Sequence, residues 1–279
     1  MALDKVVDST QLDADLTSVA NAIRDKSGGS AQLAFPSGFV SEINNISSGI
    51  SLEQVGDGNF AGVVNYTGTS LRAGAFSRSK ITEFYGPNVT TLYSYANTNC
   101  AFADCSELRV LSLPKITTTY AKDYLAHNCS KLESVRFDAL TAVGTNHLTY
   151  SLVTVLVLPK VNGILYATAL AHNTKLEAID LYKPNFARTN ALNGCTKLTT
   201  IIIRNTSVSS LSNINNLGST PFASGGTGGT LYVPQSLIAS YQSATNWSTI
   251  LGYANNSIAA IEGSIYETAY ADGTPISTT

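Results

Sequence analysis

A short apolar motif recurs along the middle of the chain, and it limits the fold more than any other feature of the sequence. Its pattern is L-x-x-L-x-L-P-x-I, most complete from Leu108 to Ile116, and its first apolar position returns every 21 to 27 residues. The residues that open the six copies are Ile81, Leu108, Leu132, Val153, Leu176 and Leu198. Six copies in one register indicate stacked structural units of about 20–30 residues each.

Each copy predicts one short β-strand. The apolar residues of L-x-L alternate, so both side chains point to the same face of a strand. One repeat cannot bury that face alone, whereas stacked repeats bury it in continuous columns. The predicted columns are Leu108, Leu132, Val153, Leu176 and Leu198, then Leu111, Val135, Leu156, Ile179 and Ile201, and then Leu113, Phe137, Leu158, Leu181 and Ile203. The positions between them are expected to face solvent.

Two segments, Ala101–Leu108 and Asn193–Leu198, together with Ala75-Phe76, carry a second pattern, A-F-x-x-C-S-x-L. These segments resemble the BspA-type leucine-rich repeats of bacterial surface proteins and phage proteins, over about residues 60–233. The resemblance implies a β-rich leucine-rich-repeat solenoid of short strands, with about six repeats plus end caps, over residues 50–230. The chain departs from the pattern at Tyr150 and Asn173, which stand where the family has Cys.

Residues 1–49 predict a small helical module. Thr10 and Asp13 have the spacing of a helix-capping pair, and a second helix is expected after Pro36. The segment resembles the heads of tail-associated proteins from phages and prophages of Gram-positive bacteria, which implies attachment to other phage tail proteins or oligomerisation. Self-association, for which a homotrimer would suit a tail fibre, and packing on the first repeat both stay open. The predicted oligomerisation residues are Leu12, Leu16, Val19, Ile23, Phe39 and Ile43.

The C-terminal part predicts a strand and a helix that together cap the open end of the apolar columns, over residues 231–264. Leu237, Ile238 and Tyr241 recur at helical spacing, and Trp247 follows them. Caps of this kind keep stacked repeats soluble. Residues 265–279 are expected to form a loose tail.

Composition narrows the functional classes. Only 13% of residues are charged and the net charge is −2, which argues against nucleic acid as a partner. No apolar stretch approaches the about 18 residues of a membrane span, and the N-terminus lacks an export signature, so release within a phage particle is one expected route. Three of the four cysteines, Cys105, Cys129 and Cys195, share one repeat position, where buried thiols are expected.

Catalytic motifs are missing from the sequence. Two histidines, His127 and His172, stand in Ala-His-Asn turns before a repeat, as structural residues would. We therefore expect no enzyme activity, no catalytic residue, no cofactor and no metal site.

The predicted function is non-enzymatic binding. One alternative is a virion component, namely a phage tail fibre, tail tip or receptor-binding protein that contacts a host cell-surface protein or glycan. The other is an adhesin or protein-interaction module at the bacterial cell surface. Tyrosines among small polar residues suit adaptable binding surfaces, although they could equally pad the repeat core. The candidate receptor-binding residues are Tyr93, Tyr95, Tyr120, Tyr124, Arg109, Arg136, Val157 and Asp180.

Overall fold

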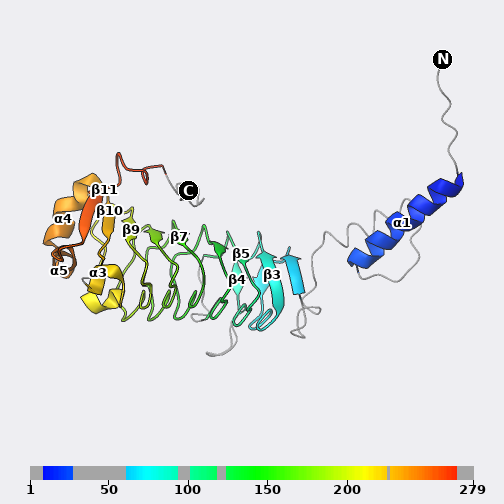
Figure 1. Ribbon diagram of the computed structural model, residues 1–279, viewed down its shortest axis with the longest axis horizontal. Helices are drawn as coiled ribbons and strands as arrows, with labels where there is room; N and C mark the ends of the chain where they lie inside the picture. The colour runs from blue at the N-terminus through cyan, green and yellow to red at the C-terminus, as the bar shows by residue number, and fades with distance from the viewer. Residues whose placement is uncertain (1–8, 28–60, 94–100, 118–123, 225–226, 269–279) are drawn as a thin grey trace, which may run out of the picture. The chain divides into compact units, whose positions relative to one another are not determined.

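The computed structural model describes residues 9–27, 61–93, 101–117, 124–224 and 227–268 (Figure 1). The chain divides into two compact units, Met1–Ile50 and Ser51–Thr279, and each is described by itself. In the first unit, helix α1 spans Ser9–Ser27, where the sequence predicts the first helix.

On α1, Ala20 and Ile23 are buried and Leu16 packs against them, whereas Val19 is half exposed. The side chain of Leu12 and the second predicted helix, with Phe39 and Ile43, lie outside the described residues. The oligomerisation role of these residues stays a prediction.

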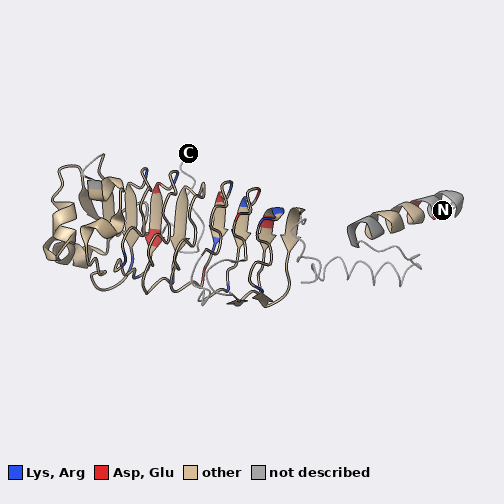
Figure 2. Cartoon of the chain, turned by 90° about the horizontal axis from the view of Figure 1, so that it is seen from below, with Lys and Arg blue, Asp and Glu red and all other residues tan. Residues whose placement is uncertain are grey.

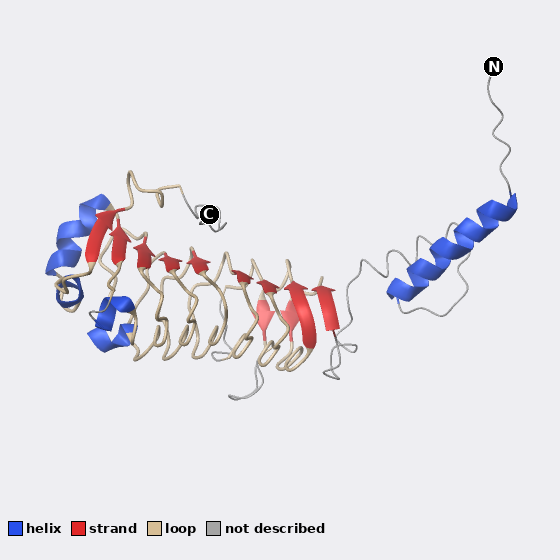
Figure 3. Cartoon of the chain, in the orientation of Figure 1, coloured by secondary structure: helices blue, strands red, loops and turns tan. Residues whose placement is uncertain are grey.

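Two parallel sheets run through the second unit, with roughly one strand from each repeat. The first sheet has the order β1 (Ala61–Asn65), β3 (Lys80–Tyr85), β5 (Val110–Ser112) and β6 (Ser134–Arg136). The second has the order β11 (Ser257–Ala260), β10 (Thr230–Val233), β9 (Thr200–Ile203), β8 (Ala178–Leu181) and β7 (Val155–Leu158). Figure 3 shows these strands side by side in one row, which makes the unit a β-rich repeat fold.

The register of the strands confirms the predicted columns. Leu111 pairs with Val135 in the first sheet, and Ile179 pairs with Ile201 in the second. All five residues of the first column and all five of the third are buried. The exception is Val135 in the second column, which is only half-buried.

A two-stranded parallel sheet, β2 (Ser70–Leu71) with β4 (Thr91–Leu92), forms part of another side of the early repeats. Single parallel bridges continue the contact between later repeats, as between Val143 and Leu165 and between Phe186 and Leu211. Each repeat therefore turns back on itself around a closed apolar interior.

The remaining side is a row of turns that hydrogen-bond from repeat to repeat. In each turn, the residue directly before the cysteine position has a left-handed backbone with φ between 57° and 77°, as at Asp104, Asn128, His172 and Gly194. Its N–H donates to the next repeat, as Asp104 does to the carbonyl of His127 at 2.9 Å. Asn, Asp and Gly tolerate this conformation best, which explains part of the turn sequence.

The cysteine position holds a small hydrogen-bond donor. The thiols of Cys105, Cys129 and Cys195 donate to main-chain carbonyls of the preceding repeat at 2.8–3.1 Å. The amide of Asn173 does the same to the carbonyl of Leu148 at 2.6 Å, so Asn replaces Cys without loss of the contact. In the repeat between those of Cys129 and Asn173, Ser151 occupies the cysteine position. Tyr150 has the left-handed φ of 60° and therefore occupies the position directly before it.

The C-terminal end carries short helices: η1 (Ile214–Leu217), α3 (Pro221–Ser224), η2 (Gln235–Leu237), α4 (Ile238–Ser243) and α5 (Trp247–Leu251). Trp247 is buried against Phe186 and donates from Nε1 to the carbonyl of Ser209 at 2.7 Å. Tyr241 accepts from the N–H of the same serine at 2.9 Å. Strand β11 after α5 adds an element that the sequence pattern does not predict.

Candidate interaction surface

The outward side of the first sheet forms a surface that we call the first-sheet face. Strand register sets its residues in two aligned rows: Val63, Glu83, Val110 and Ser134, and then Asn65, Tyr85, Ser112 and Arg136. Val63 is 52% exposed, and Asn65, Ser134 and Arg136 are exposed as well. The rows alternate with the buried column of Phe84 and Leu111, so their side chains point away from the core.

This face mixes apolar, hydroxyl and charged groups at the spacing of adjacent strands, about 4.8 Å. The hydroxyl of Tyr85 donates to a carboxylate oxygen of Glu83 at 2.7 Å, and that bond raises the pKa of Tyr85. Arg136 lies 2.7 Å from Asp138, but both side chains remain accessible. Such a surface can offer aromatic contact and several hydrogen-bond donors and acceptors to a partner.

The predicted binding residues do not gather at one place. Arg136 lies on the first-sheet face, and Arg109 is exposed directly before β5. Tyr93 is 57% exposed, but it follows β4, which lies on another side of the repeats. Tyr124 lies in the turn row, with its ring edge-on to His127. Tyr95 and Tyr120 lie outside the described residues. The sequence analysis missed Tyr85, although its place two residues beyond Glu83 on an alternating strand is a usable signal.

The outward side of β7–β10, which we call the second-sheet face, is covered by the chain itself. Ile202 on this face is fully buried in a cluster with Ile261, and Val155, Val157, Tyr232 and Tyr266 pack against the two. The expectation that all positions between the columns face solvent is therefore wrong here. Unbroken apolar runs such as Ile201-Ile202-Ile203 are typical of strands buried on both faces.

Asp180 is not an exposed binding residue as predicted, since its side chain is only 1% exposed. Arg204 binds it with three hydrogen bonds of 2.7–2.9 Å. Burial raises the pKa of Asp180, and Arg204 partly offsets that effect. Val157 is also half-buried by the cluster, so neither residue is freely available to a receptor.

Tyr266 departs from the loose tail predicted for residues 265–279. Its ring contacts Tyr232 at a centroid distance of 4.6 Å, and its carbonyl accepts from Nη2 of Arg204 at 2.8 Å. Residues 269–279 lie outside the described residues.

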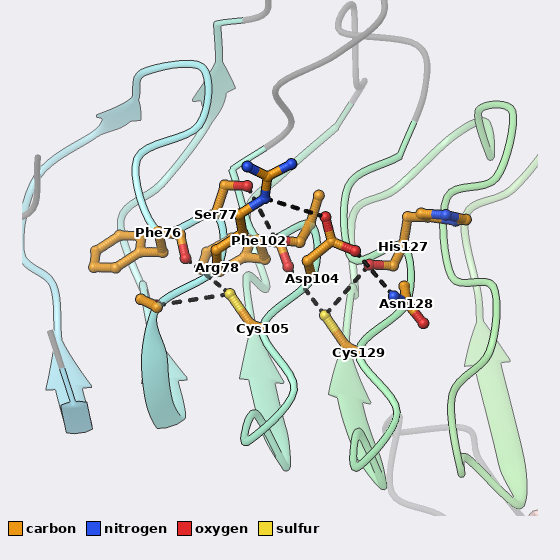
Figure 4. A network of polar contacts seen from close by, with 11 residues as sticks. Phe76, Ser77, Arg78, Phe102, Asp104, Cys105, His127, Asn128 and Cys129 are labelled. Carbon is orange, nitrogen blue, oxygen red and sulfur yellow. Dashed lines mark hydrogen bonds and ion pairs between the residues drawn. The ribbon is translucent and has the colours of Figure 1, made fainter. Parts of the chain in front are cut away.

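A polar network runs along the turn row in the early repeats (Figure 4). Arg78 lies 3.7 Å from Asp104, which accepts from the side-chain amide of Asn128 at 2.9 Å. Beneath it Cys105 and Cys129 point toward the interior, as expected for buried thiols. A hydrogen bond with Cys105 and burial raise the pKa of Cys129, and burial raises the pKa of Cys195 to about 12. The raised pKa keeps the thiols of Cys129 and Cys195 protonated, as hydrogen-bond donors to the main chain.

Charge is distributed unevenly along the repeats. Figure 2 shows acidic and basic residues interspersed over the strands of the first sheet, while the C-terminal helices carry none. From Asn205 to Ile261 the sequence has no Asp, Glu, Lys or Arg. Within the described ranges no group of three His, Cys, Asp or Glu side chains could hold a metal ion, and no helix is suited to cross a bilayer.

No curated protein matches the chain. A family comparison does match the middle of it, which includes β5 to β9 and the cysteine positions, whereas β1 to β4, β10 and β11 lie outside the match. Residues 98–225, less than half of the chain, match the model of the BspA type leucine rich repeat region, in six copies.

Proposed function

We propose that the chain is a non-enzymatic component of a phage or prophage tail whose repeats, wound as a solenoid, are displayed for attachment to a host bacterium. The repeat match supports the coarser part of this statement, an interaction or adhesion module. The phage assignment depends on the resemblance of residues 1–49 to tail-associated heads. In this proposal the head attaches the chain to other tail proteins or to further copies of itself.

The observation that carries the binding role is the first-sheet face. It offers Tyr85, Glu83 and Arg136 in register on rigid strands, with exposed Val63 beside them. Side chains held on strands lose little freedom on binding, which favours affinity. The mixed chemistry suits a cell-surface protein or glycan better than a strongly charged polymer.

Substitutions on the first-sheet face are expected to weaken attachment. Labelled full chain with Tyr85→Ala and Arg136→Glu should bind purified cell walls of Gram-positive bacteria, including the strain that carries the gene, at least tenfold more weakly than the unaltered chain. The loss follows because truncating an aromatic side chain that a bound partner covers and reversing a charge each cost about 1–2 kcal/mol at an interface.

The matched control is Tyr182→Ala with Lys197→Glu, which changes an exposed tyrosine and an exposed lysine away from this face. The control protein should bind walls as the unaltered chain does. Equal binding by all three proteins would remove the first-sheet face as the attachment site.

An adhesin on the bacterial surface is the second candidate, because the same repeat match supports it. Gold-labelled antibody against the chain separates the two locations in electron micrographs of an induced culture. The tail proposal predicts label on the tails of released particles and little on intact cells. Label confined to the envelope of intact cells would contradict it.

A further inference from the structure

A segment near the C-terminus, residues 261–268, is seated on the second-sheet face, and we call it the cover segment. It comes directly after β11 and packs in one cluster with residues of β10, β9 and β7, which lie one, two and four positions from β11 in the sheet. Ile261 closes over Ile202, and the ring of Tyr266 lies against Tyr232. The face would otherwise present an apolar patch of Val155, Val157, Ile202 and Tyr232 to solvent.

The cover segment holds to the face through few groups. Its polar anchor there is the carbonyl of Tyr266, which accepts from Nη2 of Arg204. Its first two residues are also tied to β10 and to the residue that begins η2: the N–H of Ile261 donates to the carbonyl of Val233 at 2.9 Å, and the N–H of Gln235 donates to a carboxylate oxygen of Glu262 at 2.8 Å. Further bonds lie within the segment, such as that from the N–H of Ser264 to the carbonyl of Ile261 at 3.0 Å and that from the N–H of Glu267 to the carbonyl of Ser264 at 3.2 Å. Ile265 is 69% exposed, and Glu262 and Glu267 are exposed too. One aromatic ring and one aliphatic side chain therefore supply the apolar contact.

The face beneath is built independently of the cover segment. Strand pairing fixes Val155, Val157, Ile202 and Tyr232, and the pair of Asp180 and Arg204 joins β8 to the residue after β9. Because Asp180 orients the guanidinium and balances its charge, the pair offers an N–H donor without a net charge. Together with the apolar patch, it suits an uncharged stretch of polypeptide that carries an aromatic side chain and a main-chain carbonyl.

We propose that the second-sheet face is a peptide-binding site, and that the cover segment is its internal ligand. The ligand class is an extended protein segment whose aromatic side chain takes the place of Tyr266 on Tyr232 and whose carbonyl accepts from Arg204. This inference depends on the proposed interaction function, but it needs neither the tail location nor the first-sheet face. A partner segment binds when the cover segment leaves, so the two compete for one surface.

The test uses the full chain and a labelled peptide with the sequence of residues 261–268, followed by fluorescence anisotropy. In the full chain with Tyr266→Ala, the cover segment loses its ring, and the peptide should bind at least tenfold more tightly than to the unaltered chain. The matched control is Ile265→Ala, which alters an exposed neighbour and should behave like the unaltered protein. A peptide whose own tyrosine is replaced by alanine should lose at least tenfold in affinity.

Equal affinity of the three proteins for the peptide, or equal affinity of the two peptides for Tyr266→Ala, would overturn the proposal. Circular dichroism must show that Tyr266→Ala remains folded. If it does not, Tyr266→Leu with the same titration decides the matter, because leucine keeps apolar volume but not the ring. Binding to cell walls through the first-sheet face is measured in a separate experiment. If the chain fails to bind cell walls while the peptide binds as predicted, only the attachment role is contradicted.

Discussion

Replacement of Arg204 by Met is expected to lower the free energy of unfolding by about 3–5 kcal/mol, as measured by urea denaturation of the full chain. The substitution leaves the Asp180 carboxylate, 1% exposed, without the guanidinium that binds it from two nitrogens. An uncompensated buried charge loses its hydration with no replacement. The carbonyl of Tyr266 loses a donor in the same change.

A second variant tests whether the loss of stability comes from the unpaired charge of Asp180. The double change Asp180→Leu and Arg204→Met removes both charges and should recover most of the lost stability, because apolar replacements of buried ion pairs are often neutral. The control Arg136→Met removes an arginine whose ion pair is exposed and should cost no more than about 1 kcal/mol. A loss of similar size for Arg136→Met and Arg204→Met would contradict the role assigned to burial.

Acid is expected to destabilise the fold through His147. This side chain is fully buried, and neither ring nitrogen has a hydrogen-bond partner among the described residues. Burial lowers the pKa of His147 from 6.5 to about 3. Below pH 6.5 the unfolded chain therefore binds a proton that the folded chain rejects. Stability is greatest above pH 6.5 and falls toward pH 3, by about 1.4 kcal/mol for each pH unit.

The His147→Leu variant should remove that acid dependence. At pH 7 it is expected to be more stable than the unaltered chain by about 1–3 kcal/mol, because two unpaired polar atoms leave the core. By pH 4.5 the difference should grow by a further 2–3 kcal/mol or so. Thermal or urea unfolding at a series of pH values measures both effects.

Phe137→Leu is the matched control, since Phe137 packs against His147 with a centroid distance of 6.3 Å and does not titrate. It should lower stability by a similar amount at every pH. A pH-independent difference between His147→Leu and the unaltered chain would show that His147 does not carry the acid effect.

The repeat pattern predicted the strands because its signal is local and recurs. Alternation within L-x-L assigns each side chain to a face, and the repeat spacing assigns each strand to a neighbour. Leu111 opposite Val135 and Ile179 opposite Ile201 follow from those two facts alone. The shared cysteine position is equally local, since a small buried donor is needed wherever the turn presents a carbonyl. It extends to Asn173, which the sequence marked only as a departure.

The candidate surfaces depended on contacts between distant parts of the chain. Arg204 and Tyr266 are 62 positions apart, and no spacing in the sequence indicates that their atoms meet. Ile202 is buried with Ile261, and Asp180 is buried with Arg204 as its partner, while Arg136 and Val63, on equivalent strand faces, stay exposed. Strand alternation determines which face a side chain points to. Whether that face meets solvent depends on what covers it, and only the tertiary structure decides this.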